Sequence, residues 1–159
     1  MTPPAAEAIA PHEISDMALA RQRLRLWLHM LKAVRHIEND LRDRLRREFD
    51  TTLPRFDVLA TLHARPEGLK MTDPSQQLMV SNGNVTGIVD RLVTDGLAER
   101  QVVENDRRAF RIQITDKGRL LMDRMLAAHQ RWIDELLQSV PESDVARGIS
   151  IMMDLRNRH

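Results

Sequence analysis

The spacing of apolar residues between positions 72 and 115 predicts two short helices followed by a hairpin of two strands. In the second helix an apolar residue recurs every three or four positions, so these side chains share one helix face. The residues are Val85, Ile88, Val89 and Leu92. Ser81 is a good N-cap for this helix, and Gly96 is a suitable stop. The first helix, over Thr72–Met79, ends so close to the second that the two must cross steeply.

The opposite face of the second helix is small and polar, as a surface that reads DNA bases would be. Its residues are Ser81, Asn82, Gly83, Asn84, Thr86, Gly87, Asp90 and Arg91. In a helix, each glycine lowers stability by roughly 1 kcal/mol relative to alanine. Their presence is explained if this face lies close to the wall of a DNA groove, because glycine has no Cβ that would collide with it. Asparagine can pair with adenine, arginine with guanine, and the threonine methyl group can contact thymine. If this helix is considered alone, the alternative interpretation is a surface helix that its glycines and asparagines make less stable, with no role in binding DNA.

The segment after this helix is expected to form a β-wing. Leu97–Val103 is strand-like, and Phe110, Ile112 and Ile114 alternate with polar residues, which predicts one buried face and one exposed face. The charged tip between the strands carries Arg107 and Arg108. An arginine at a hairpin tip can enter a minor groove, where narrow A·T tracts concentrate negative potential. The alternative is a solvated turn with an incidental ion pair, and the preceding helix pair favours DNA.

Helices are also predicted on both sides of this segment. A long amphipathic helix ends near Asp50, and Pro54 fits the first turn of the next helix. After the wing, Thr115 can cap a helix that runs to about Ser139. Pro141 then separates it from a final helix.

These elements predict a mainly α fold with a small β-wing. We expect a disordered arm at 1–14 and a single unit at 15–159, with the winged helix-turn-helix at about 54–115. The helices at 15–50 and 116–157 are too amphipathic to stand alone around one small domain, so they are expected to pair with a second copy. A homodimer would place two recognition helices about one duplex turn, roughly 34 Å, apart.

Composition and charge narrow the function classes. The 159 residues suit one compact domain with a real core, and the net charge of +1 argues mildly against a generic nucleic-acid coat protein. Charge is uneven, at +5 over residues 21–55 and zero over 81–115. The absence of cysteine excludes disulfides and thiol redox sensing. Neither a secretory signal nor an apolar run of membrane-spanning length is found, so a cytoplasmic protein is expected.

Catalytic and metal-binding patterns are absent from the sequence. His29 and His36 are seven residues apart, but no His-x-x-x-His pair or carboxylate cluster accompanies them, so surface or pocket histidines are favoured over a metal site. The segment GNVTG lies within a helical pattern and is no phosphate loop, and no serine stands in a nucleophile elbow. We therefore predict no enzyme, no cofactor and no metal.

The segment resembles the winged helix-turn-helix of MarR-family bacterial transcription regulators. The residues that carry the resemblance read SNGNVTGIVDRLVTDGLAER, then DRR in the wing, then ITDKG at the start of the next helix. The likeness runs from about Leu24 to Leu155, with Pro74 standing where similar sequences more often have leucine. It implies a homodimer on a pseudo-palindromic operator. Ser81–Arg91 would then read the major groove of double-stranded DNA, and Arg107 or Arg108 the minor groove.

The resemblance also implies a pocket for a small-molecule effector, where the first helix, the second helix and the helix after the wing meet. The residues there would be Trp27, Met30, Arg35, His36, Arg55, Phe56 and His63, with Met122 and Met125. Arg35 and Arg55 could meet a carboxylate or phosphate, although a methionine and aromatic cluster is more often simple core. The stretch LWLHMLKAVRHIENDLRDRLRREFDTTLPRFDVLATL resembles regulators of aromatic-acid catabolism, which implies an aromatic acid or its CoA thioester.

The leading hypothesis is a dimeric repressor that releases DNA when its effector binds. An alternative is a winged-helix adaptor that binds proteins without sequence-specific DNA binding, which the neutral segment 81–115 mildly favours. A small hydrolase or metal enzyme is the third and weakest hypothesis.

Overall fold

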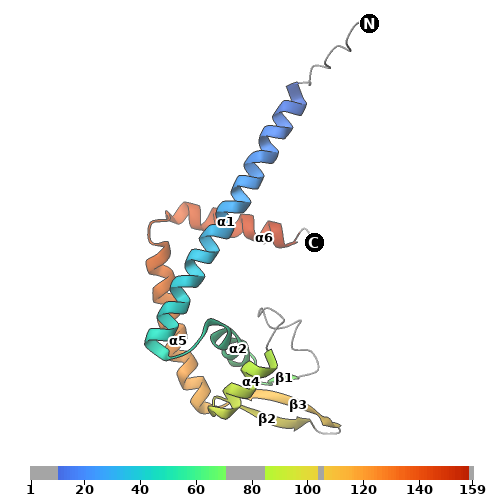
Figure 1. The fold of residues 1–159 in the computed structure, drawn as a ribbon, viewed down its shortest axis with the longest axis vertical. Helices are drawn as coiled ribbons and strands as arrows, with labels where there is room; N and C mark the ends of the chain where they lie inside the picture. Colours follow the sequence, from blue (N-terminus) through green and yellow to red (C-terminus); the bar gives the residue numbers. More distant parts are fainter. Residues whose placement is uncertain (1–10, 71–84, 104–105, 158–159) are drawn as a thin grey trace, which may run out of the picture. The chain divides into compact units, whose positions relative to one another are not determined.

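The computed structural model describes residues 11–70, 85–103 and 106–157. By contacts the chain divides into two compact units, residues 1–40 and 41–159, and each is described by itself. The elements of Figure 1 are, in chain order, α1 (Pro11–Phe49), α2 (Leu53–His63), β1 (Leu69–Lys70), α4 (Val85–Thr94), β2 (Ala98–Val103), β3 (Asp106–Ile114), α5 (Asp116–Leu137) and α6 (Glu142–Asn157). This mainly α architecture with a small sheet confirms the predicted fold class.

The described part of the first unit is the N-terminal part of α1, residues 11–40. The helix begins at Pro11, so the predicted disordered arm over 1–14 is wrong for its last four residues. Proline suits a helix start because the first N–H groups of a helix have no intrahelical partner. Most large apolar side chains of this unit are left exposed within the chain, at 44–57% of their accessible area. They are Met17, Leu19, Leu24, Leu26, Trp27, Leu28 and Val34.

The core of the second unit lies where α2 packs against α4, α5 and β3. Its most deeply buried side chains are Leu45, Val58, Leu59, Leu62, Leu92, Ile112, Met122 and Met125. The apolar stripe of α4 faces this core, with Val85, Val89 and Leu92 buried and Ile88 half-buried. This confirms the helical face predicted from their spacing.

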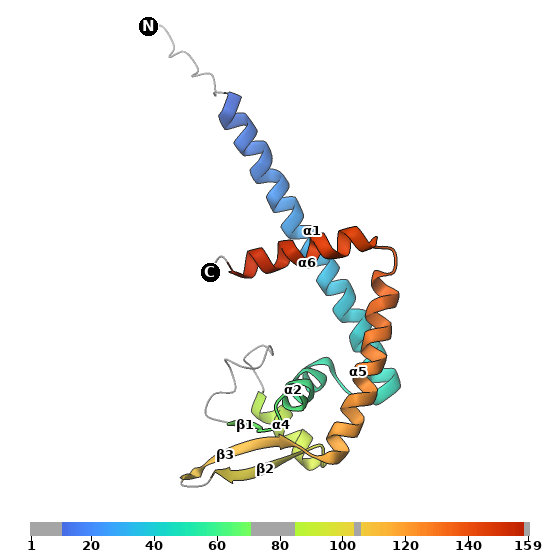
Figure 2. The same cartoon turned by 180° about the vertical axis from the view of Figure 1, so that it is seen from behind.

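The sheet is antiparallel, in the order β1-β3-β2. Ala98 pairs with Ile114 and Val102 with Phe110, with a register irregularity after Val102. The hairpin of β2 and β3 confirms the predicted wing, and in both views it extends away from the start of α5 (Figures 1 and 2). The strand β1 was not predicted, because two residues are too short to show a period of two.

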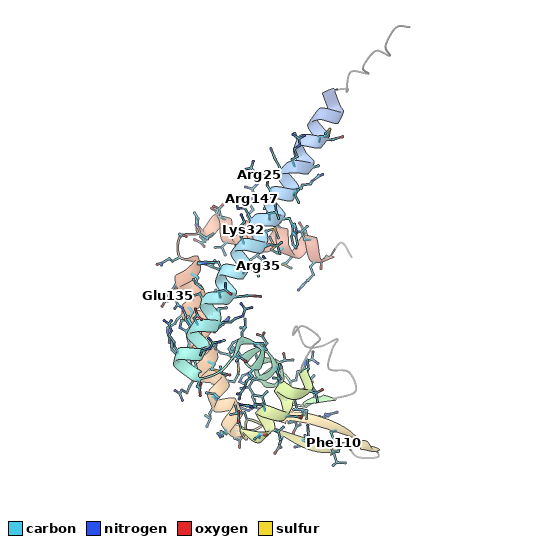
Figure 3. All side chains as sticks on the ribbon, in the orientation of Figure 1. Arg25, Lys32, Arg35, Phe110, Glu135 and Arg147 are labelled. Carbon is cyan, nitrogen blue, oxygen red and sulfur yellow. The ribbon has the colours of Figure 1, made fainter. Side chains whose placement is uncertain are left out.

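One residue of the wing that was predicted to be buried is exposed. Phe110 was expected on the buried face with Ile112 and Ile114, and that prediction is wrong, because Phe110 is 42% exposed. Its pairing partner Val102 is 61% exposed. Figure 3 shows Phe110 on the part of the hairpin that extends past the helices, so no described element covers it. The alternation of apolar and polar residues along β3 therefore extends further along the strand than the core that covers its apolar face.

The joint between the wing and α5 is tightly built. The Thr115 side chain accepts a hydrogen bond from the backbone N–H of Gly118 at 3.0 Å, which confirms the predicted cap. Its hydroxyl also donates to the Gly96 carbonyl at 2.7 Å, and Gly96 adopts a φ of 71°, a conformation that glycine tolerates best. A Cβ on Gly118 would lie 2.1 Å from the Leu97 carbonyl oxygen. The Thr-x-x-Gly sequence is therefore explained by a cap and a close backbone contact.

The C-terminal end of the second unit leaves an apolar surface. No residue of α6 is buried within the chain. With the end of α5, it lines an apolar groove of about 510 Å³. The exposed large apolar residues of α6 are Val145, Ile149, Ile151, Met152, Met153 and Leu155. This helix therefore resembles the first unit in having apolar side chains that its own chain does not cover.

Candidate nucleic-acid interface

The exposed face of α4 carries part of the polar surface predicted from the sequence. Thr86, Gly87, Asp90 and Arg91 are all exposed, opposite the buried stripe. Of the other predicted base-reading residues, Ser81, Asn82, Gly83 and Asn84 lie outside the described residues, as does the expected helix over 72–79 with Pro74. The described part of α4 therefore presents small and polar side chains where a reading surface is expected.

An ion pair links this face to the wing. The guanidinium group of Arg100 on β2 donates to the Asp90 carboxylate on α4. Both side chains are about half exposed, at 46% and 53%. The pair neutralises the only acidic side chain of α4. Sequence reasoning missed it because the two residues belong to different elements, and only the return of the chain into the sheet brings them together.

The wing tip contains the two arginines predicted to enter the minor groove. Arg107 and Arg108 lie at the start of β3, next to the tip residues 104 and 105, which are outside the described part. The backbone of β3 therefore places both arginines at the far end of the hairpin from α5. Their role in binding DNA stays a prediction.

Charged residues also gather at the C-terminal end of α4. Arg55, in the first turn of α2, forms an ion pair with Asp95. The ammonium group of Lys117, in the first turn of α5, donates to the Asp95 carbonyl at 2.8 Å. These residues, with Arg91, border an open hollow of about 590 Å³. Arg55 was predicted as an effector contact, and here it faces α4 rather than the methionines of the core.

Three of the predicted effector residues lie in the second unit. Phe56 is buried and stacks on the His129 ring, with centroids 5.1 Å apart. Burial lowers the pKa of His129 below its ordinary value of 6.5. His63 is half-buried and forms a hydrogen bond with the Asp123 carboxylate at 2.8 Å. Met122 and Met125 are almost fully buried, which agrees with the core interpretation of the methionine cluster.

The other four predicted effector residues lie in the first unit. Trp27, Arg35 and His36 are exposed and Met30 is half-buried within the chain. Figure 3 labels Arg35 with Arg25 and Lys32 along this basic part of α1. The predicted pocket draws on both units, so it stays a prediction.

The described ranges contain neither a cluster of metal-ligand side chains nor a helix suited to cross a membrane. Among residues 11–70, 85–103 and 106–157, no three histidine, aspartate or glutamate side chains are grouped as metal ligands would be. In the same ranges no helix combines the length and apolar character needed to cross a membrane.

Comparison with known proteins gives the family. Residues 51–110 match the MarR family. The HTH-type transcriptional regulator PecS of Dickeya dadantii is 31% identical over 104 residues, which cover 64% of this chain and 63% of PecS, slightly under two thirds of its length. The match to the family includes α2, α4, β2 and most of the wing.

Solved structures extend the likeness over most of the chain. A MarR family transcriptional regulator from Silicibacter pomeroyi is 32% identical with a TM-score of 0.75, covering 87% of this chain and 96% of that one. Another from Streptomyces coelicolor, solved in complex with DNA, shares the fold at 16% identity, with a TM-score of 0.73 over 96% of this chain and 90% of that one. The family match over residues 51–110, the winged helix and the 32% identity to the Silicibacter pomeroyi regulator over 96% of that chain lead to one conclusion. The chain belongs to the MarR family of transcriptional regulators.

Proposed function

We propose that this regulator binds double-stranded DNA through the exposed face of α4 and the wing, as a homodimer on a pseudo-palindromic operator. The observation that carries the proposal is the orientation of α4, whose apolar stripe is buried while Thr86, Gly87 and Arg91 stay exposed. A helix held this way can enter a major groove, which is wide enough to admit it. The DNA complex of the similarly folded Streptomyces coelicolor regulator supports the same use of the fold.

Residues 81–115 have no net charge, so we expect further phosphate contacts from outside this reading segment. Arg46 and Arg47 are exposed in the last turn of α1 and can provide such contacts. They would fix the position of the protein on the duplex without reading sequence. Specific contacts would come from Ser81–Arg91 in the major groove and from Arg107 or Arg108 in the minor groove.

The dimer is supported by apolar side chains that the single chain leaves uncovered at both of its ends. Seven large apolar residues of the first unit are about half exposed, and α6 has no buried residue. Exposed apolar patches of this kind mark interfaces, and a second copy would cover the same patches symmetrically. Two reading helices would then meet successive turns of one DNA face.

The effector part of the proposal rests on the resemblance to regulators of aromatic-acid catabolism. An aromatic acid or its CoA thioester would bind near Trp27, Arg35 and His36 and shift the dimer toward a spacing that misfits the operator. The protein would then act as a repressor. A ligand can shift this equilibrium only by its differential affinity for the two spacings, so effector and operator must weaken each other's binding.

Fluorescence anisotropy tests the core of this proposal. A labelled duplex from upstream of the protein's own gene is titrated with protein at moderate salt, with random duplex as competitor. Specific regulators bind their sites at least about 10³-fold more tightly than random DNA. Binding that random duplex removes as readily as the cognate duplex would contradict sequence-specific regulation. Benzoate and benzoyl-CoA are then added to the bound complex, and release by either one supports the effector assignment.

Removing the ion pair on the reading face should weaken DNA binding. The variant Arg100→Gln leaves Asp90 unpaired beside the phosphates, so we expect a loss of about three- to tenfold in affinity, or about 0.7–1.4 kcal/mol. Both side chains are half exposed, so folding should change by less than about 1 kcal/mol. The double variant Asp90→Asn/Arg100→Gln should recover most of the affinity in the same anisotropy assay. Equal binding by the single and double variants would contradict a role for Asp90 charge.

A protein-binding adaptor is the second candidate function. The exposed pair Val102 and Phe110 on the wing favours it, because apolar side chains at a hairpin end are available to another protein. The variant Phe110→Ser separates the two functions. An adaptor should lose its partner in co-purification, whereas DNA affinity should fall little if Phe110 serves no groove contact.

A further inference from the structure

The apolar face of the wing extends further along the hairpin than the core that covers it. Val102 and Phe110 pair with each other across the two strands, and the alternation along β3 places them on the same face as Ile112 and Ile114. Ile112 and Ile114 are buried, whereas Val102 is 61% and Phe110 42% exposed. Figure 3 shows Phe110 on the part of the hairpin that extends past the helices. Val102 and Phe110, the apolar pair of the wing, are therefore open to solvent at the outer end of a covered face.

The opposite face of the wing is polar along the same length. Gln101 pairs with Arg111, and Glu99 pairs with Gln113. Gln101 is exposed, and its amide donates a hydrogen bond to the Glu99 carboxylate at 2.9 Å. An aromatic residue paired with a β-branched one stabilises a hairpin, but this does not require both to be exposed. Adjacent exposed apolar residues therefore indicate a contact surface on the other face.

The apolar pair lies on the side of the wing that is turned toward α4. Arg100, which pairs with Ile112 on the same face, reaches Asp90 on the exposed face of α4. Val102 and Phe110 form the next pair of this face toward the tip. The major and minor grooves of a duplex are separated by one sugar–phosphate strand. If α4 enters a major groove and the wing the adjacent minor groove, that strand passes between them along the face that carries the apolar pair.

The charges on either side of the apolar pair suit a nucleic-acid strand better than an apolar protein segment. Arg100 lies toward α4, and Arg107 and Arg108 lie at the tip end of β3. A sugar–phosphate strand alternates charged phosphates with deoxyribose groups whose C–H edges are apolar. Arginines can therefore contact the phosphates while the apolar side chains cover the sugars.

We propose that Val102 and Phe110 contact the deoxyribose groups of the DNA strand that passes between α4 and the wing. This contact rests on the proposed function and adds an apolar surface to it. Contacts to the sugar position a protein on the duplex but carry no sequence information. The apolar pair should therefore contribute equally to the binding of operator and of random duplex. Its contribution should not depend on salt, because it releases no counterions from the phosphates.

Protection of a thiol on this face tests the contact directly. Because the chain has no cysteine, Val102→Cys introduces a single thiol. Its reaction with N-ethylmaleimide, an uncharged reagent, is timed without DNA and with saturating duplex from upstream of the protein's own gene. We expect the duplex to slow this reaction at least about tenfold. Gln101→Cys on the opposite face is the matched control, and its thiol should be slowed less than about twofold.

Anisotropy on the same samples separates a failure of this contact from a failure of the proposed function. If the wild type binds no duplex, the proposed function is contradicted and the contact with it. If Val102→Cys binds duplex while its thiol reacts as fast as in the free protein, the contact alone is overturned. Equal slowing of the thiols in Val102→Cys and Gln101→Cys also overturns it, because the two residues lie on opposite faces.

Replacing the aromatic side chain measures its contribution to affinity. Phe110→Ala should bind operator and random duplex at least about fivefold more weakly, by the same factor for both and with an unchanged salt slope. Phe110→Leu keeps most of the apolar area and should stay within about twofold of the wild type. Thermal unfolding of each variant checks that the wing remains folded.

Two other results would assign Phe110 to a different partner. A loss of affinity confined to the operator would mean that Phe110 contacts bases, as apolar wedges in the minor groove do. Wild-type affinity for DNA in Phe110→Ala, together with loss of a co-purifying protein, would assign the residue to the adaptor function. Either result overturns the contact with deoxyribose.

Discussion

Replacing Gly118 with alanine is expected to lower the free energy of unfolding by at least about 3 kcal/mol, near the upper end of the usual cost of overpacking. The new Cβ would lie 2.1 Å from the Leu97 carbonyl oxygen and 2.9 Å from the Ile114 Cγ1 atom. The first of these is backbone, and its position is fixed because Leu97 donates its N–H to Leu92 and accepts from Thr115. Relief would require the wing and α5 to separate. Urea unfolding followed by circular dichroism measures the effect.

A matched substitution elsewhere controls for helix propensity. Gly148 also lies in a helix, and a Cβ there would have no atom within 4 Å. Gly148→Ala should therefore stabilise the chain by up to about 1 kcal/mol, since alanine is the better helix former. If Gly118→Ala unfolds at the same urea concentration as the wild type, the close packing of the wing against α5 is contradicted.

Replacing Gly87 with leucine should separate folding from DNA binding. Gly87 is exposed in the third position of α4, so leucine improves helix propensity and meets solvent in the free protein. On the duplex, the added side chain would hold the helix away from the base edges. We expect at least a tenfold loss of operator affinity, which corresponds to about 1.4 kcal/mol, with unchanged or higher thermal stability. Anisotropy and thermal unfolding measure the two effects.

The control for this substitution is a leucine on an exposed helix position outside the reading face. Gln130 on α5 is suitable, and Gln130→Leu should bind the operator as the wild type does. Wild-type affinity in Gly87→Leu would mean that this face of α4 does not enter a groove. The contact with DNA would then have to be assigned to other residues.

The sequence pattern was sufficient wherever local chemistry decides the structure. The stripe on α4 follows from helical spacing, and the cap at Thr115 follows from a hydroxyl placed three residues before Gly118. The hairpin follows from strand-like runs on either side of a turn-forming tip, the second of which alternates apolar and polar residues. Each of these signals lies within a short window, so no knowledge of distant contacts is required.

The features that the sequence did not reveal depend on contacts between elements. Asp90 forms an ion pair with Arg100, and Arg55 forms one with Asp95, forty residues away in the sequence. No local spacing of residues predicts either pair. Phe110 was mispredicted for a different reason. It continues the apolar alternation of β3, but the core does not extend along the strand as far as this residue. Alternation specifies a strand face, but the extent of the packed core decides which residues of that face are buried.

The candidate site was predictable to a similar degree. Exposure of Thr86, Gly87 and Arg91 follows directly from the position of the buried stripe on α4. The charged hollow at the C-terminal end of α4 was not predictable, because its cations come from the starts of α2 and α5 and the end of α4. Only the fold brings these helix ends together, although Arg55 had been identified as an anion contact on grounds of charge.

Hydroxyl-radical footprinting of the protein on its own upstream DNA tests the central claim most directly. Two copies of α4 entering successive major grooves should protect two symmetric segments whose centres lie about 10 base pairs apart on one face of the duplex. The wing should extend each protected segment outward into the adjacent minor groove. A single protected segment, two segments out of phase with the helical repeat, or uniform weak protection along the whole duplex would contradict the account.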